Sequence, residues 1–150
     1  MNNIFNIVVI GGGHAGVEAV LAAKRMGLQV ALITLDATKI GRMSCNPAIG
    51  GIGKTHLARE IDALGGEMAL NTDFSAIQYK LLNTSKGPAV QAPRAQCDKK
   101  KYQLRMKHVL EQYENLEIFQ SLVIGLLVRN DQCVGVKTSL DLDIYGKTVI

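Results

Sequence analysis

The order of hydrophobic and polar positions along the chain predicts an α/β fold. Residues 4–10 are almost continuously apolar, as expected of a central parallel strand that is covered on both faces. Residues 14–26 place small and apolar side chains at helical spacing, and Gly27 supplies a C-terminal cap. Residues 29–34 form a second apolar run. Two parallel strands joined by a right-handed crossover helix are therefore predicted.

Two long loops separate short regular elements in the middle of the chain. Residues 38–53 and 83–96 are rich in Gly, Ser, Asn and Pro, and loops of this length are usually functional or disordered. The apolar content of the first loop argues against disorder. Between the loops, the pattern predicts a helix over 54–64 and a strand with one solvated face over 77–81.

The last third of the chain changes from helix to strands. Residues 98–113 have a helical period, and residues 116–119 are predicted as a third parallel strand. Three further strands are expected to form an antiparallel meander, at residues 122–128, 133–139 and 142–145. A meander in place of a crossover helix favours FAD over a plain NAD dehydrogenase. The predicted fold is thus a Rossmann-like FAD-binding fold.

The end of the chain has the pattern of one more strand. Residues 147–150 look like the opening of a buried strand with no polar tail behind it. We therefore expect residues 1–150 to be the N-terminal part of the FAD-binding domain of a longer protein.

The stretch between the first strand and the first helix has the spacing of a dinucleotide-binding fingerprint. Gly11 allows a tight turn, Gly13 lets a diphosphate approach the backbone, and Gly16 lets the helix pack closely on the sheet. The helix N-terminus adds N–H groups and a partial positive charge. The predicted cofactor-binding residues here are Gly11, Gly12, Gly13, His14, Ala15 and Gly16.

The ribose-binding position departs from the usual pattern. In this kind of fold an acidic residue at the end of the second strand usually binds the ribose hydroxyls. This chain has Thr34 there, and the nearest acid is Asp36. Asp36 could reach the ribose, or Thr34 could use its hydroxyl, or Asp36 simply begins a surface loop. Thr34 and Asp36 are both kept as candidates.

Composition and charge limit the class of protein. The 150 residues are 47% hydrophobic, enough for one globular domain with a core. A net charge of +4 permits an acidic partner such as RNA. The three cysteines form neither a zinc motif nor a disulfide framework, and no apolar run reaches membrane-spanning length. A cytoplasmic location with no membrane contact is expected.

A P-loop look-alike lies in the first long loop. Ala48 and the run Gly53-Lys54-Thr55 approximate the phosphate-binding motif of NTPases. A P-loop must directly follow a buried strand, whereas Pro47 and polar residues precede this one, and its first glycine is replaced by Ala48. An NTPase site is therefore disfavoured.

With these loops in view, the chain resembles the glucose-inhibited division protein A family over essentially its whole length. Two of the matching segments, Met43–Gly51 and Ser85–Val90 with Pro93–Gln96, are diagnostic of the family, unlike the glycine fingerprint alone. The chain departs from the family at Thr55 and Cys97, where glycine and alanine are typical. The matching segments are Gly11–Ala19, Met43–Gly51, Glu60–Gly66 and Ser85–Val90 with Pro93–Gln96.

The resemblance implies an FAD-dependent tRNA modification enzyme. With a tRNA-modification GTPase, the family attaches an aminomethyl or carboxymethylaminomethyl group to carbon five of the wobble uridine. A folate supplies the one-carbon unit through the partner, FAD mediates electron flow, and NADH can reduce the flavin. The resemblance also implies a homodimer.

The resemblance also suggests roles for single residues. Cys45 matches a cysteine of the family whose thiol handles the uracil. This role is chemically plausible, because a thiolate adds readily to carbon six of uracil and makes carbon five nucleophilic. The alternative is that Cys45 is a small buried hydrophobic residue. Val123 matches a position whose backbone contacts the adenine. A basic stretch supplies candidates for tRNA or diphosphate contacts, namely Lys86, Arg94 and Lys101. The alternative is that this stretch is merely solvated.

Three other classes remain as alternatives. A plain NAD-linked dehydrogenase would share the fingerprint but would be colourless, and a P-loop NTPase would need Lys54. The third is a non-catalytic module. The resemblance further implies that the loop with Cys45 lies beside the flavin ring.

Overall fold

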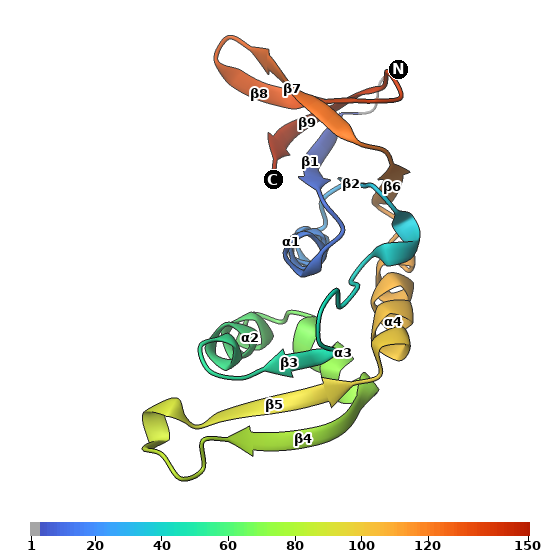
Figure 1. The fold of residues 1–150 in the computed structure, drawn as a ribbon. Coiled ribbons are helices and arrows are strands. Elements are labelled where there is room, and N and C mark those ends of the chain that lie inside the picture. The colour runs from blue at the N-terminus through green and yellow to red at the C-terminus, as the bar shows by residue number, and fades with distance from the viewer. Residues whose placement is uncertain (1–3) are drawn as a thin grey trace. The chain divides into compact units, whose positions relative to one another are not determined.

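The computed structural model describes residues 4–150, which form two compact units (Figure 1). Unit 1 runs to Gly41 and resumes at Lys107, and unit 2 comprises Arg42–Met106. Among the described residues, the longest helix has 13 residues, and no helix is long and apolar enough to cross a membrane. That the whole chain is part of one FAD-binding domain stays a prediction.

Unit 1 is built on a six-stranded sheet of order β6-β2-β1-β9-β8-β7. The neighbours from β6 to β9 pair in parallel, and β9, β8 and β7 pair antiparallel. Helix α1 connects β1 to β2, as predicted. The strands are β1 (Phe5–Ile10), β2 (Val30–Thr34), β6 (Leu116–Gln120), β7 (Val123–Arg129), β8 (Gln132–Thr138) and β9 (Asp143–Val149), and the helices are α1 (His14–Arg25) and the 3₁₀ turn η1 (Ala37–Lys39).

Strand β9 joins the meander to the parallel sheet. Its first part pairs antiparallel with β8, where Tyr145 faces Gly135, and its second part pairs parallel with β1, where Thr148 faces Ile7. The prediction of a meander is confirmed. The prediction of separate strands at 142–145 and 147–150 is wrong, because one continuous strand spans both.

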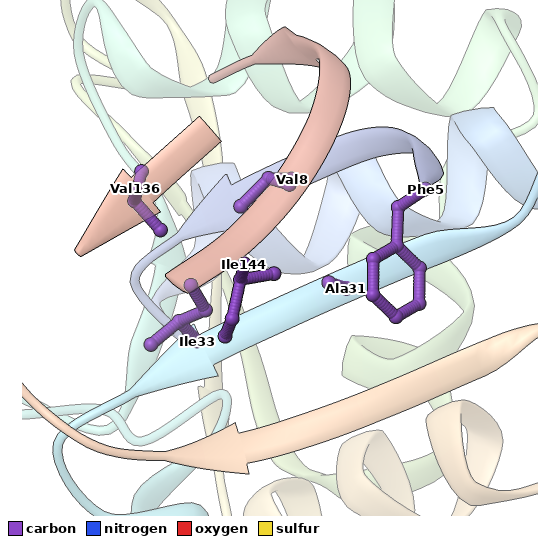
Figure 2. Packing of buried hydrophobic residues seen from close by; sticks show 6 residues of the cluster. All are labelled: Phe5, Val8, Ala31, Ile33, Val136 and Ile144. Carbon is purple, nitrogen blue, oxygen red and sulfur yellow. The ribbon is translucent and has the colours of Figure 1, made fainter. Parts of the chain in front are cut away.

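The core of unit 1 lies on the central strands (Figure 2). All five residues of β2 are buried, which explains why its sequence is apolar without alternation. Phe5 meets Phe119 edge to face, with ring centroids 6.1 Å apart. Fully burying a Val, Ile or Phe side chain contributes roughly 1.5–3 kcal/mol. The cluster comprises Phe5, Val8, Ala31, Ile33, Val136 and Ile144.

Unit 2 contains a smaller antiparallel sheet of order β3-β5-β4. Helices α2 and α3 lie on one side of it (Figure 1). Helix α4 begins in this unit and continues past Met106. The elements are β3 (Ala48–Gly50), α2 (Lys54–Ala63), α3 (Met68–Ser75), β4 (Ala76–Leu82), the 3₁₀ turn η2 (Pro88–Val90), β5 (Ala92–Cys97) and α4 (Lys99–Glu111).

Three elements of unit 2 differ from the sequence prediction. Strand β3 lies within the predicted loop 38–53, and β5 lies partly within the predicted loop 83–96. Strand β5 has no strand signal because its sequence contains Pro93 and polar residues, although it is the central strand of this sheet. Helix α3 lies between the predicted helix 54–64 and the predicted strand 77–81, where the pattern predicts no element, because the face that this helix buries is polar rather than apolar.

Helix α3 buries three polar side chains by satisfying them internally. Asn71, Thr72 and Ser75 are at most 5% exposed. The Thr72 and Ser75 hydroxyls donate to backbone carbonyls one turn earlier, at 2.7 Å each. The Asn71 amide donates to the Tyr102 carbonyl at 2.9 Å, and its oxygen accepts from Arg105, which also pairs with Glu67. Hydrogen bonds therefore hold α3 to α4 where apolar packing would be expected.

We predict that Asn71→Ala lowers the free energy of unfolding by about 1–3 kcal/mol, because it leaves buried hydrogen-bonding groups without partners. Urea denaturation measures the change. Asn115→Ala is the matched control, because that side chain is exposed, and it should change stability by less than about 0.5 kcal/mol. Equal effects of the two variants would contradict this account of α3.

Candidate functional site

The glycine turn after β1 in unit 1 is fixed by a close backbone contact. Gly11 has φ +105°, and its N–H donates to the Ile33 carbonyl at 2.8 Å. A Cβ at Gly16 would lie 1.9 Å from the Gly11 carbonyl oxygen. The first turn of α1 therefore sits directly on the end of β1, and only glycine fits at position 16.

The middle of the turn has one crowded and one open glycine. A Cβ at Gly12 would lie 3.0 Å from both Ile40 Cγ1 and Thr34 Oγ1. At Gly13, the N-cap of α1, an added Cβ would meet no atom within 4 Å. The first turn of α1 contains no acidic residue, and the first N–H groups of a helix have no acceptor within it. This cradle fits the diphosphate of a dinucleotide.

His14 and Ala15 complete the first turn of the helix. His14 is half-buried, and this burial lowers the pKa of its imidazole, which nearby Glu18 opposes. The neutral imidazole is therefore favoured at pH 7. Ala15 is exposed at the helix start.

The end of β2 lies beside the glycine turn. Thr34 is 9% exposed, and its hydroxyl lies against Gly12. The Asp36 carboxylate is already engaged: it accepts from the Thr38 N–H at 2.9 Å and pairs with Lys39 at 2.8 Å. These partners, Lys39 first, lower the pKa of Asp36 to about 2. Asp36 thus caps the turn η1, and a contact with the ribose from either residue stays a prediction.

The end of β6 supplies residues that sequence reasoning missed. The Gln120 side chain accepts from the Ala37 N–H at 3.0 Å, and Ser121 N–H donates to the Thr34 carbonyl at 3.0 Å. No motif could have signalled these contacts, because they depend on the pairing of β6 with β2.

Val123 follows a few residues later, at the start of β7. It is half-buried against the core of unit 1, and it pairs with Thr138. The carboxyl ends of β1, β2 and β6 thus place Gly11–Gly16, Thr34, Asp36 and Val123 along one side of the sheet, where such folds bind nucleotides. The contact of the Val123 backbone with adenine stays a prediction.

In unit 2, Cys45 is exposed in the loop that leads into β3. The Pro47 carbonyl accepts from the Cys97 N–H at 2.6 Å, which anchors the end of this loop to β5. Cys97, by contrast, is buried, and burial raises the pKa of its thiol. The alternative interpretation of Cys45 as a small buried side chain is therefore wrong. Its catalytic role stays a prediction.

Cys45 lines a cavity of about 400 Å³, which we call the Cys45 cavity. Of the three basic residues proposed from the sequence, only Arg94 lines it. Lys86 is exposed in the turn after β4, and Lys101 on α4 lies 4.5 Å from the ring of Phe74. The structure thus does not gather these three residues around this cavity.

Lys54 also lines the Cys45 cavity. The sequence singles out Lys54 only as part of the P-loop look-alike, and an NTPase site there is disfavoured. The neighbouring Thr55 instead binds the backbone, since its hydroxyl accepts from the Gly51 N–H at 3.0 Å and lies 2.9 Å from the Pro93 carbonyl. Within residues 4–150, no group of three His, Cys, Asp or Glu side chains could hold a metal ion.

Comparison with known proteins places this architecture in a family. The model of the glucose inhibited division protein A family matches residues 6–150. The chain belongs to the glucose inhibited division protein A family. It is 58% identical over 146 residues to the tRNA uridine 5-carboxymethylaminomethyl modification enzyme MnmG of Aquifex aeolicus, and 55% identical over 146 residues to MnmG of Geobacter sulfurreducens.

Solved structures of this family have the same fold. Crystal form I of Aquifex aeolicus GidA matches with a TM-score of 0.92 and 57% identity, over 98% of this chain and 24% of that one. The two MnmG matches cover 97% of this chain but only 24% and 23% of the relatives, so the chain spans about a quarter of their length. PqsL of Pseudomonas aeruginosa, at 13% identity and a TM-score of 0.69, shares the fold alone.

We predict that Gly16→Ala destabilises the protein by about 1–3 kcal/mol, because the added methyl group must displace the Gly11 backbone. Gly13→Ala is the matched control, since its added methyl group meets no atom within 4 Å and its φ of −77° suits alanine. Thermal unfolding of both variants measures the difference. Equal stability of the two would show that the close packing of α1 on β1 is not required.

Proposed function

We propose that this chain is the cofactor-binding part of an FAD-dependent enzyme that modifies carbon five of the wobble uridine in tRNA. The observation that carries the proposal is its 58% identity, over 97% of its length, to a protein named for this modification. The group attached is aminomethyl or carboxymethylaminomethyl. Because the chain spans a quarter of that relative, the complete reaction belongs to a longer protein.

The residues of unit 1 would hold the FAD. The turn at Gly11–Gly16 receives the diphosphate, with Gly13 leaving room for it. Thr34 or Asp36 binds the adenosine ribose, and the Val123 backbone contacts the adenine. FAD, when bound, supplies electron transfer, with NADH as its reductant.

The exposed thiol of Cys45 would handle the uracil. Its thiolate forms a bond to carbon six, and the electron pair of the C5–C6 double bond moves toward carbon five and the O4 carbonyl. Carbon five can then add to the electrophilic carbon of the folate-derived unit, and the π electron pair of its C=N bond moves onto the nitrogen. Loss of the proton on carbon five re-forms the double bond and expels the thiolate, so the cysteine is regenerated. The exposure of Cys45 in a cavity supports this role.

The remaining components are proposed from the resemblance to the family. A tRNA-modification GTPase acts with the enzyme, a folate supplies the one-carbon unit through that partner, and the enzyme is a cytoplasmic homodimer. Lys86, Arg94 and Lys101 are proposed contacts to tRNA. The net charge of +4 supports binding to an anionic polymer.

We predict that Gly13→Glu abolishes flavin binding, because the new side chain would fill the diphosphate position and its carboxylate would repel the diphosphate. The visible absorbance of bound flavin, measured on the full-length protein that contains this chain, reads this out. Gly87→Glu is the matched control, since position 87 is exposed and its added Cβ meets no atom within 4 Å. Unchanged flavin in Gly13→Glu would show that the diphosphate binds elsewhere.

We predict that Cys45→Ser abolishes modification of wobble uridine in cells, because a hydroxyl is a much weaker nucleophile than a thiolate. Mass spectrometry of tRNA nucleosides measures the modified base. Cys133→Ser is the control, because the Cys133 thiol lies on β8, where it donates to the Gly135 carbonyl at 3.6 Å, and modification should persist. Normal modification in Cys45→Ser would exclude the thiol from the mechanism.

A further inference from the structure

The Cys45 cavity is cationic. Its polar side chains are those of Cys45, Asn46, Lys54 and Arg94, and no carboxylate lines it. Its volume of about 400 Å³ falls in the range of small-ligand sites, about 300–1,000 Å³. Ile52 and Leu82 add apolar surface. Such a lining suits a ligand that carries negative charge beside a flat apolar group.

Backbone contacts fix the two cations of the cavity. Arg94 lies on the central strand β5, in register with Gly50 of β3. A Cβ at Gly50 would lie 2.3 Å from the Pro93 carbonyl oxygen, so the two strands approach as closely as only glycine permits. Lys54 begins α2, and the hydroxyl of Thr55 holds that helix start to both Gly51 and Pro93. Both cations are thus presented by rigid elements.

A third cation lies beside them. Lys80 of β4 is the register partner of Arg94, so their side chains share one face of the sheet. Like charges directly opposite each other on paired strands are destabilising. The arrangement therefore lowers the stability of the protein unless an anion binds there.

None of these three cations is neutralised within the chain. In residues 4–150, Lys54, Lys80 and Arg94 form no ion pair and no side-chain hydrogen bond. Other basic side chains do find carboxylates, namely those of Lys39, Arg105, Lys107 and Lys137. What distinguishes these three cations is their placement, because two of them line the Cys45 cavity and the third is the register partner of Arg94.

We propose that Lys54, Lys80 and Arg94 form a phosphate-binding subsite that holds the RNA backbone on either side of the target uridine. Lys54 and Arg94 line the cavity and contact the phosphate of the nucleotide that enters it. Lys80 does not line the cavity, so it contacts a neighbouring phosphate, which a polymer supplies and a single nucleotide does not. The apolar lining receives the base next to Cys45. This inference rests on the proposed function.

The test measures RNA affinity over a salt series with the full-length flavin-bound protein. The probe is a fluorescent anticodon stem-loop with a wobble uridine, and the variants are Lys54→Gln, Lys80→Gln and Arg94→Gln. Each should weaken binding and reduce the slope of log K against log[salt] by about one. Lys147→Gln is the matched control, because Lys147 is an exposed lysine on β9 and should leave the slope unchanged.

Two further measurements separate this role from other causes. Thermal stability should stay equal or rise in Lys80→Gln and Arg94→Gln, because each removes a like-charge repulsion; a purely structural role would lower it. Bound flavin should be unchanged. A loss of flavin in these variants would assign the cavity to the cofactor and overturn the proposal.

The remaining outcomes also decide the matter. RNA affinities and slopes equal to those of Lys147→Gln would overturn the subsite. The subsite would also be overturned if the variants abolished only the competition by inorganic phosphate and left RNA binding unchanged. The cavity would then bind a free anion. Failure of the proposed function is visible separately, as absence of flavin from the unsubstituted protein, whereas the charge variants report RNA binding directly.

Discussion

The glycine turn of this protein depends on one steric constraint, the contact between the start of α1 and the carbonyl of Gly11. Any side chain at Gly16 would overlap that oxygen, at 1.9 Å. The helix therefore begins next to the open position at Gly13, where its first N–H groups have no acceptor within the helix. The apolar packing of β1 and β2 then holds this geometry rigidly, since all residues of β2 are buried.

The elements that could be predicted from sequence are those whose stability comes from apolar burial. The runs at 4–10 and 29–34 correspond to β1 and β2, and the helix between them has nearly the predicted bounds. Helix α3 and strand β5 escape prediction because Asn71 and Arg94 stand where apolar residues would signal an element. Hydrogen bonds to backbone groups and strand register stabilise these parts, and neither leaves a periodic signal.

The candidate sites divide in the same way. The spacing of Gly11, Gly13 and Gly16 reports a constraint between near neighbours, so the sequence is enough to locate it. The grouping of Lys54, Lys80 and Arg94 depends on which residues face each other across two strands, and only the structure supplies that register. The P-loop look-alike illustrates the point: β3 pairs antiparallel with β5 at the sheet edge, which is not the context a P-loop needs, yet its lysine lines a cavity.

Strand β9 has a consequence for how unit 1 opens. Its residues hydrogen-bond to the meander on one side and to β1 on the other, and Ile150 exchanges two backbone bonds with Val8 and Ile10 at 2.9 and 2.8 Å. Fluctuations of the hairpin therefore cannot be confined to the sheet edge. We therefore expect the meander and the strand that leads into the glycine turn to open as a single cooperative segment, with amide protons that exchange together with solvent.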